Sequence, residues 1–276
     1  MAEGRAVLVT GSTGGIGTAT VGLLRRRGFT VYAGARGQAD FGPEVRVLPL
    51  DVTDPESVAA AAKRVAGEVD GLWAVINNAG VIVQGPLELI PAAEWRRQLE
   101  VNTLGPASVI REFLPLIRSA HGRIVNVSAP TGRVAMPLLG ALSASKAGLE
   151  AMSNALRLEL AAWKIPVVVI EPGTTETEIF ARAGAAADSS MQHTDPSRVQ
   201  LYEAHLAAYE KAMARFKPGP VEKVAETIVR AVEARRPKRR YAVAEARTLG
   251  GILPKLPAGL RDRVLTSAVG LNGINP

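Results

Sequence analysis

Short apolar runs alternate with longer amphipathic stretches along most of the 276-residue chain. The runs consist mainly of Val, Ile, Leu and Ala, which predicts strands that are covered on both faces, as in a parallel sheet. The stretches between them show helical periodicity. The predicted strands cover 5–10, 30–34, 45–50, 72–77, 123–128, 166–171 and a short segment near 240–244, and the predicted helices lie near 15–28, 55–67, 91–118, 140–163 and 221–235.

This alternation predicts right-handed βαβ units. The expected fold class is therefore α/β, a Rossmann-type doubly wound parallel sheet of about seven strands flanked by helices, in a single domain over 1–276. Residues 176–216 interrupt the rhythm, and we expect a lid with a mobile centre there, because ligands bind beyond the carboxyl ends of such strands. Residues 245–276 are expected to form a C-terminal extension.

Composition excludes several kinds of chemistry. The absence of cysteine rules out disulfides, thiolate catalysis and zinc–cysteine sites. The formal charge is +7, part of it in ARRPKRR at 234–240, but this run is short and lacks aromatics, so we interpret it as a solvated helix end rather than a nucleic-acid site. We expect no metal, no signal peptide, no membrane-spanning segment and a cytoplasmic location.

A glycine cluster directly follows the first predicted strand. The stretch VLVTGSTGGIGTAT places Gly11, Gly15 and Gly17 between that strand and a helix. Glycines there permit a tight turn and let backbone N–H groups approach a pyrophosphate at the positive end of the helix. The position of the cluster predicts a dinucleotide-binding loop.

The end of the second predicted strand selects the cofactor. An acidic residue there would bind the adenosine ribose hydroxyls, but YAGARGQ contains none, and the first acid is Asp40. Arg36 is able to bind a 2′-phosphate through two hydrogen bonds, with help from Ser12. The sequence therefore predicts NADP(H) rather than NAD(H).

These features form part of a longer series of motifs. In chain order they are TGSTGGIG (10–17), DV (51–52), NNAG (77–80), Asn102 in VNTLG, Ser128 in NVS, SASK (143–146) and PGTTET (172–177). In order and spacing the series resembles the short-chain dehydrogenase/reductase family over about residues 5–245. The tail also looks like the branch that includes retinol- and steroid-type dehydrogenases.

The resemblance implies a role for each matching residue. Lys146 would hydrogen-bond the nicotinamide ribose, Asn102 would hold a water that links Lys146 to solvent, and Ser128 would polarise the substrate carbonyl. The remaining implied cofactor contacts are Gly11, Ser12, Gly15, Ile16, Gly17 and Arg36, then Asp51 and Val52 at the adenine, Asn78, Ala79 and Gly80 at the adenosine ribose, and Pro172, Gly173, Thr175 and Thr177 at the nicotinamide end.

One position departs from the family. The family has a tyrosine four residues before the lysine, where it exchanges the proton of the reaction, but here that residue is Leu142. Ser143 is no easy substitute, because it lies about 100° further round the helix. A general acid contributes about 10²–10⁴ in rate. We therefore expect slow reduction of simple ketones and normal hydride transfer to acceptors that need no proton, such as iminium ions or conjugated systems.

Three functions stay open at this point. The first is an NADP(H)-dependent reductase or dehydrogenase with an altered proton path. The second is a non-redox enzyme, such as a cyclase, dehydratase or isomerase, in which the bound cofactor shapes the pocket. The third is a non-catalytic dinucleotide-binding protein. Tyr202 and Tyr209, seven residues apart in the lid, are candidate replacement acids, but we interpret both as ordinary apolar packing.

The lid and the tail are rich in Ala, Leu and Met, which favours a bulky apolar small molecule such as an intermediate of secondary metabolism. The predicted helices at 91–118 and 140–163 resemble the dimer-forming pair of the family, so a homodimer or homotetramer is expected. The expected substrate pocket comprises Gln84, Ser128, Pro130, Leu142 and Thr174.

Overall fold

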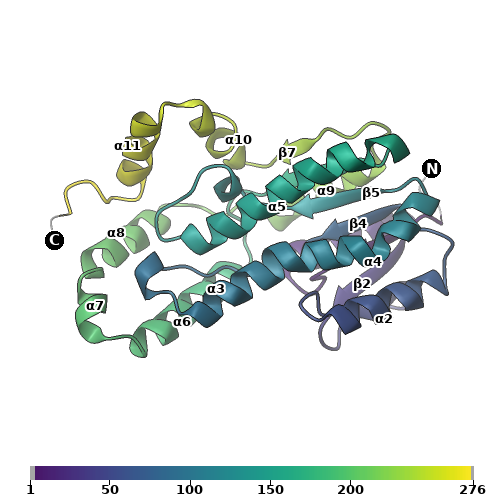
Figure 1. Ribbon diagram of the computed structural model, residues 1–276, viewed down its shortest axis with the longest axis horizontal. Coiled ribbons are helices and arrows are strands. Elements are labelled where there is room, and N and C mark those ends of the chain that lie inside the picture. Colours follow the sequence, from purple (N-terminus) through teal and green to yellow (C-terminus); the bar gives the residue numbers. More distant parts are fainter. Residues whose placement is uncertain (1–3, 275–276) are drawn as a thin grey trace.

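The computed structural model describes residues 4–274, which form a seven-stranded parallel sheet flanked by helices (Figure 1). The strand order is β3-β2-β1-β4-β5-β6-β7, so the order reverses between β1 and β4. All seven predicted strands are present. Their bounds are β1 Ala6–Val9, β2 Thr30–Ala35, β3 Val45–Pro49, β4 Ala74–Asn77, β5 Arg123–Val127, β6 Val167–Glu171 and β7 Arg240–Ala242.

Helices cover both faces of the sheet, which explains why the strands are apolar throughout rather than alternating. One face packs against α1 and α9, and the other against α2, α4 and α5. These five helices span Gly15–Arg26 (α1), Pro55–Ala66 (α2), Gly105–Ser119 (α4), Gly140–Glu159 (α5) and Val221–Glu233 (α9).

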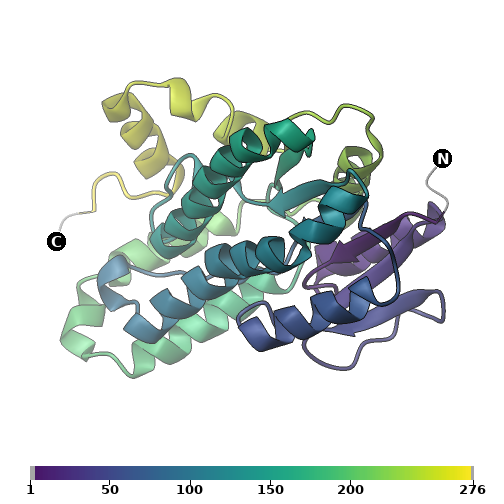
Figure 2. The ribbon, with the colours of Figure 1, turned by 45° about the vertical axis from the view of Figure 1, so that its right-hand side comes forward.

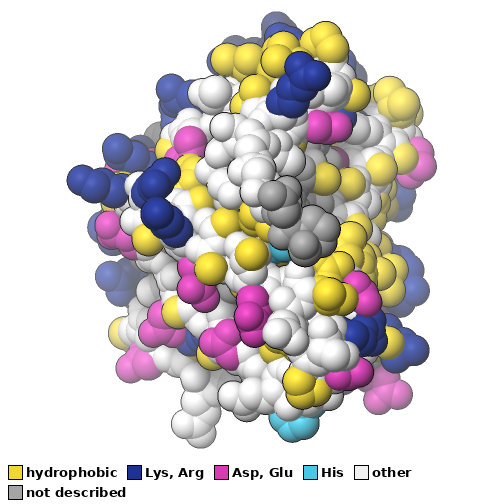
Figure 3. Space-filling view, turned by 90° about the vertical axis from the view of Figure 1, so that its left-hand side faces the viewer, with side chains coloured by type: hydrophobic (Ala, Val, Ile, Leu, Met, Phe, Trp, Pro, Cys, Tyr) yellow, Lys and Arg dark blue, Asp and Glu magenta, His cyan; other side chains and the backbone are white. Residues whose placement is uncertain are grey.

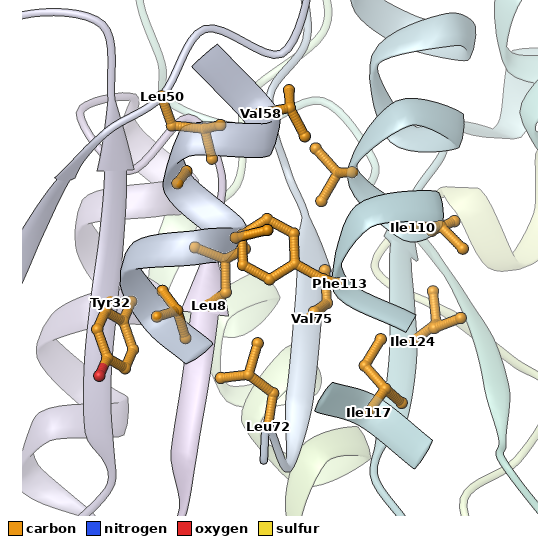
Figure 4. Packing of buried hydrophobic residues seen from close by; sticks show 14 of the residues in the cluster. Leu8, Tyr32, Leu50, Val58, Leu72, Val75, Ile110, Phe113, Ile117 and Ile124 are labelled. Atoms are coloured by element: carbon orange, nitrogen blue, oxygen red, sulfur yellow. The ribbon is translucent and has the colours of Figure 1, made fainter. Parts of the chain in front are cut away.

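Successive strand residues point to opposite faces and so divide between two cores. Leu8 and Val75 belong to the core under α2 and α4, where the ring of Phe113 lies between these helices and the strands (Figure 4). Val9 and Ile76, their neighbours along the same strands, belong to the core under α1 and α9. Fully burying a side chain of this size contributes about 1.5–3 kcal/mol, so both cores hold the strand ends in fixed positions.

The helix predicted at 91–118 is not continuous. The structure has α3 (Ala92–Leu99), then a π-helical turn (Glu100–Leu104), then α4. A π-helical turn shifts the backbone hydrogen-bond pattern by one residue, and such turns are frequent at functional sites. Asn102 lies in the middle of this turn, so the interruption falls on a predicted site residue.

The segment expected to form a lid is helical at its centre, and its mobility stays a prediction. The segment folds into α6 (Ile179–Gln192), α7 (Pro196–Gln200) and α8 (Glu203–Met213). Asp195 caps α7, since its Oδ1 accepts the N–H of Ser197 at 2.9 Å. An acidic cap followed by a proline at the first helical position was the sequence signal for this helix.

The C-terminal extension contains α10 (Ala246–Leu249) and α11 (Ala258–Ala268). Figures 1 and 2 both show the lid and the extension at the end of the molecule that is opposite the N-terminus. Within residues 4–274, no helix has both the length and the hydropathy that crossing a bilayer requires. The single turns of 3-10 helix are Leu87–Leu89, Pro130–Gly132, Leu160–Trp163 and Leu253–Lys255.

Candidate active site

The glycine loop (residues 11–17) has two positions at which no side chain fits. Gly11 has a φ of +61°, in the left-handed region that favours glycine, and a Cβ there would lie 2.7 Å from the Cα of Ala79. A Cβ on Gly17 would lie 2.3 Å from the carbonyl oxygen of Gly11. At Gly14 the same oxygen would be 3.6 Å away, which is an ordinary contact. Glycine is therefore required where the loop approaches β4 and α1.

Thr10 and Asn78 hold this loop against the end of β4. Thr10 Oγ1 accepts the backbone N–H groups of Asn78 and Ala79, each at 3.0 Å. The Nδ2 of Asn78 donates to the carbonyl oxygens of Thr10 and Gly11, also at 3.0 Å. These bonds lie where the strand order reverses, which is the point at which open α/β sheets bind ligands.

Arg36 directly follows β2 and is exposed. Its guanidinium makes no hydrogen bond or ion pair within the described residues, and it lines an open depression together with Asp40 and Arg64. Burial raises the pKa of Asp51, but hydrogen bonds from Thr53 and the charge of Arg36 outweigh burial, and the net effect lowers the pKa. Arg36 is therefore an unpaired cation beside the predicted adenosine site.

The side chain of Ser12, another predicted cofactor contact, is directed at β2. It is fully buried, and its hydroxyl donates to the carbonyl oxygen of Gly34 at 3.0 Å. Ser12 thus ties the glycine loop to β2 instead of presenting a hydroxyl beside Arg36. Ile16 and Val52, two further predicted contacts, pack with the cores on opposite faces of the sheet.

Thr177 lies against the glycine loop from the side of β6. A Cβ on Gly15 would lie 2.8 Å from the Cγ2 of Thr177. The Oγ1 of Thr177 is buried and has no hydrogen-bond partner in the part of the chain that the structure describes. Thr175 is also buried and forms an isolated bridge with Gly219. A buried hydroxyl without a partner, in contact with a loop that requires glycine, fits a dinucleotide bound alongside both of them.

The C-terminal extension borders the segment that begins at Pro172. The backbone N–H of Thr174 donates to Oε1 of Glu245. A Cβ on Gly173 would lie 2.5 Å from the carboxylate of Glu245. Glu245 could not be predicted as a site residue, because it lies about 70 residues away from Thr174 and belongs to no motif. It places a negative charge beside the predicted nicotinamide end.

Lys146 is buried in the first half of α5. Its Nζ donates to the carbonyl oxygen of Val127 at 2.8 Å, and a Cβ on Gly80 would lie 3.8 Å from Nζ. Burial lowers the pKa of Lys146 to about 8, an effect that the charge of Glu150 partly opposes. The ammonium group therefore lies between β4 and β5, and its role at a nicotinamide ribose stays a prediction.

The side chain of Asn102 is occupied by internal hydrogen bonds. Its Oδ1 accepts the N–H of Val81 at 2.9 Å, while Nδ2 donates to the carbonyl of Val81 at 2.9 Å and to Ser145 Oγ at 3.3 Å. These bonds fix the chain after β4 to α5. A water held by Asn102 would have to use the backbone of the π-helical turn rather than the side chain.

The hydroxyl of Ser128 points into the protein. It donates to Oε1 of Glu150 at 3.0 Å, and Ser128 is buried. The next residue, Ala129, has an extended backbone (φ −157°, ψ 160°), so its side chain points to the opposite side. That side chain carries no hydroxyl. The predicted polarisation of a carbonyl by Ser128 would require this hydroxyl to leave Glu150.

Glu150 belongs to a buried ion network on the side of β6 and β7. Arg240 donates to Oε2 of Glu150 at 2.7 Å and also to Glu171. Burial raises the pKa of Glu171, which the charge of Arg240 only partly offsets, whereas the two carboxylates together raise the pKa of Arg240 despite its burial. No motif in the sequence predicts this network. Its one sequence signal is the position of Glu150, one helical turn after Lys146, which places the two side chains on the same face of α5.

Leu142 contributes to an apolar cluster instead of a proton site. It is 5% exposed. The hydroxyl of Ser143, the adjacent residue, donates to the carbonyl of Leu139 at 2.8 Å and is not available to replace a phenol. We call this the lid cluster, and its buried members are Ile82, Leu139, Leu142, Ala183, Tyr209, Ala212 and Val269.

Two predicted pocket residues lie at the edge of this region. Gln84 lines a narrow recess between the chain after β4 and α6, and Ala183 lines it too. Pro130 starts the 3-10 turn that follows β5. The recess and the lid cluster share Ala183, and Val83 in the recess follows Ile82 in the cluster. The recess therefore borders the lid cluster at Ala183.

Comparison with known proteins defines the class of the molecule. A family model described as short chain dehydrogenase matches residues 5–188. Estradiol 17-beta-dehydrogenase 2 from Mus musculus is 40% identical over 189 residues, which cover 63% of this chain and 49% of that protein. This chain thus spans about half the length of that relative. Retinol dehydrogenase 5 from Homo sapiens is 34% identical over 278 residues, which cover 94% of this chain and 87% of that one.

A solved structure agrees over nearly the whole chain. The crystal structure of a short chain dehydrogenase from Burkholderia cenocepacia J2315 in complex with NADP has a TM-score of 0.76 and 29% sequence identity. The match covers 96% of this chain and 99% of that one. The chain belongs to the short-chain dehydrogenase/reductase family of oxidoreductases, and the predicted Rossmann-type fold is confirmed.

Proposed function

We propose that the protein is an NADP(H)-dependent oxidoreductase that acts on a bulky, apolar small molecule. The cofactor half of this proposal is carried by the glycine loop together with the unpaired Arg36 at the end of β2. The glycine loop would hold the pyrophosphate, Arg36 the 2′-phosphate, and Thr177 the nicotinamide end. When bound, NADP(H) supplies a hydride. The NADP complex of the related Burkholderia enzyme supports the same assignment.

The substrate half is carried by the lid cluster. Its buried members are aliphatic apart from Tyr209, so a ligand that displaces them from Leu142 must itself be largely apolar. The names of two relatives, estradiol 17-beta-dehydrogenase 2 and retinol dehydrogenase 5, point to the same class of molecule. Large apolar side chains also remain exposed on the extension, including Ile252 and Leu260, and Figure 3 shows hydrophobic side chains gathered at the top of this end of the molecule.

The residues of this chain bind and orient, but they offer little for proton transfer. Leu142 excludes water without donating a proton, and the hydroxyl of Ser128 is bonded to Glu150. Lys146 retains two N–H donors beyond its bond to Val127. The preferred hydride acceptor is therefore one that needs no proton, such as an iminium ion or a conjugated system. For any other acceptor, a water near Lys146 would supply the proton.

A non-redox reaction is the second candidate, and one observation favours it. Leu142 offers no hydroxyl and is packed among apolar side chains, so a carbonyl held beside it would lack a proton donor and be protected from reduction. In that case the bound cofactor would shape the pocket for a cyclisation, dehydration or isomerisation. For either reaction we propose a homodimer or homotetramer formed through α4 and α5, supported by the exposed side chains of Leu104 and Leu158 beside these helices.

One incubation distinguishes the two reactions. The protein is mixed with NADPH or NADH and with estrone, retinaldehyde or a cyclic iminium ion, while nicotinamide absorbance and product mass are followed together. A product heavier by two hydrogens, with NADPH consumed faster than NADH, supports the oxidoreductase. An isomer or a dehydrated product without NADPH consumption supports the second candidate. Tight NADPH binding with no conversion of any probe contradicts both reactions.

A further inference from the structure

The phenol of Tyr209 has no hydrogen-bond partner although it is buried. Tyr209 lies on α8 and is 7% exposed, and its hydroxyl oxygen is without a partner within residues 4–274. Tyr202, at the start of the same helix, is different, because its hydroxyl donates to Oε2 of Glu88 at 2.9 Å. A buried hydroxyl without a partner destabilises the structure that contains it. The closed lid therefore carries a polar group that its own residues leave unpaired.

The surroundings of Tyr209 explain why no partner is available. It packs in the lid cluster with Leu142, Ile82 and Ala183, which have no polar side-chain atoms. Burial raises the pKa of Tyr209 to about 12. The phenol consequently keeps its proton at neutral pH and is a hydrogen-bond donor there.

A second unpartnered atom lies on the same face of α8. His205 is four residues before Tyr209, so the two side chains are neighbours on the helix surface. The Nδ1 of His205 is also buried and without a hydrogen-bond partner among the described residues. Two buried polar groups without partners on one helix, of which Tyr209 belongs to the lid cluster with Leu142, indicate that a polar partner is missing at α8.

We propose that Tyr209 is the lid residue that anchors the substrate, by donating a hydrogen bond to an oxygen atom of an otherwise apolar ligand beside Leu142. The ligand class is an apolar ring system or chain with one carbonyl, ether or hydroxyl oxygen. This inference rests on the apolar substrate of the proposed function. It explains how a pocket without the family tyrosine still orients its ligand, because the hydrogen bond comes from the lid instead of from α5.

The closed lid gains from such a ligand in two ways. The ligand keeps the apolar contacts of the lid cluster, and its oxygen gives Tyr209 the partner that the protein lacks. An apolar ligand without the oxygen provides the first contribution but not the second. The hydrogen bond should therefore appear as a preference of about tenfold for the oxygen-bearing ligand over its hydrocarbon analogue.

The test uses a matched pair of ligands and a matched pair of variants. Androstanone and androstane differ by one carbonyl group, and their binding to the full chain with saturating NADPH is measured by equilibrium dialysis. Wild-type protein should prefer androstanone by about tenfold. The Tyr209→Phe variant should lose this preference by binding androstanone less tightly and androstane equally well. The control variant Tyr202→Phe, on the same helix, should retain the preference.

Three results would overturn the proposal. They are an unchanged preference in Tyr209→Phe, an equal loss in Tyr202→Phe, and a wild-type protein that binds neither steroid or binds both equally. Thermal unfolding provides a measurement without ligand: Tyr209→Phe should unfold at the wild-type temperature or above it, and a lower temperature would mean that the hydroxyl has a partner in the protein. NADPH binding is measured separately. Its absence would contradict the proposed function, whereas intact NADPH binding without steroid preference contradicts only the role of Tyr209.

Discussion

The polar groups at the ends of β1, β2 and β4, here called the nucleotide edge, are used differently from those at β5, β6 and α5, here called the reaction edge. At the nucleotide edge, Thr10 and Asn78 hydrogen-bond to the backbone of the glycine loop and the chain after β4. Arg36 at the same edge is exposed and has no ion-pair partner among the described residues. At the reaction edge, Ser128 and Lys146 are bonded to protein atoms and buried. The nucleotide edge therefore presents a free positive charge to a ligand, whereas the polar groups of the reaction edge are already bonded to other protein atoms.

In this fold, the groups that bind the nucleotide are thus separate from the groups that would transfer the proton of the reaction. Nucleotide binding at the nucleotide edge depends on the shape of the backbone, and the two hydrophobic cores fix that shape. The reaction edge depends on individual hydroxyl groups, and here one position is Leu142 while another hydroxyl is bonded to Glu150. Desolvation of Glu150, Glu171 and Arg240 opposes the gain from their ion pairs, and the network holds the carboxylate that binds the hydroxyl of Ser128.

Restoring the phenol should have the largest effect. With Leu142→Tyr, we expect reduction of a bound ketone to accelerate by about 10²–10⁴, since a general acid then stands one helical turn from Lys146. Adding Ala129→Ser to this variant should raise the rate further, because it places a hydroxyl on the wall opposite to the Glu150 side. The rates are measured with NADPH and estrone under single-turnover conditions.

The matched control for this prediction is Leu142→Phe, which introduces the same ring without the hydroxyl. It should leave the rate near that of the original protein. Equal rates for the Tyr and Phe variants would show that the reaction edge no longer places a carbonyl near the nicotinamide, and the contrast between the two edges would then lie in substrate position rather than in proton supply.

A test of the nucleotide edge should give the next largest effect. A Cβ at Gly17 would lie 2.3 Å from the carbonyl oxygen of Gly11, whereas one at Gly14 would lie 3.6 Å from it. Overpacking of this kind costs about 1–3 kcal/mol, so Gly17→Ala should weaken NADPH binding about 10- to 100-fold. Gly14→Ala should bind NADPH normally. Fluorescence titration gives both constants, and similar affinities for the two variants would mean that the loop shape is not what binds the cofactor.

Particular residues show how far the sequence alone could go. The strands and the glycine loop follow from local patterns, because covered strands are apolar and tight turns need glycine. Ser12 shows the limit, since a serine in such a loop is equally suited to a phosphate or to the carbonyl of Gly34. Only the register of β1 against β2 decides between them.

Contacts between segments that are far apart in the chain could not be predicted from the sequence. Glu150 and Arg240 are 90 residues apart, and their pairing depends on β7 lying beside β6. The mobility of the lid centre stays a prediction. Its small residues satisfy helical propensity, and its helices pack onto the lid cluster through Ala183 and Tyr209.

The smallest expected effect concerns the charge that the reaction edge buries. Burial lowers the pKa of Lys146 to about 8, from 10.5 in an exposed lysine. Between these pH values the unfolded chain holds a proton that the folded chain has released, so this group makes the free energy of unfolding rise with pH. Below about pH 8 both states are protonated and the full cost of burial is present. Lys146→Met removes this titration.

The free energy of unfolding of Lys146→Met, relative to wild type, should therefore be highest below about pH 8 and should fall by about 1 kcal/mol or more as the pH approaches 10.5. Urea unfolding at a series of pH values measures it. The control is Lys63→Met, at an exposed position of α2, which makes the same substitution without removing a buried ammonium group. A constant difference for Lys146→Met would mean that the ammonium group is solvated in the folded protein, and the reaction edge would then be as open to charge as the nucleotide edge.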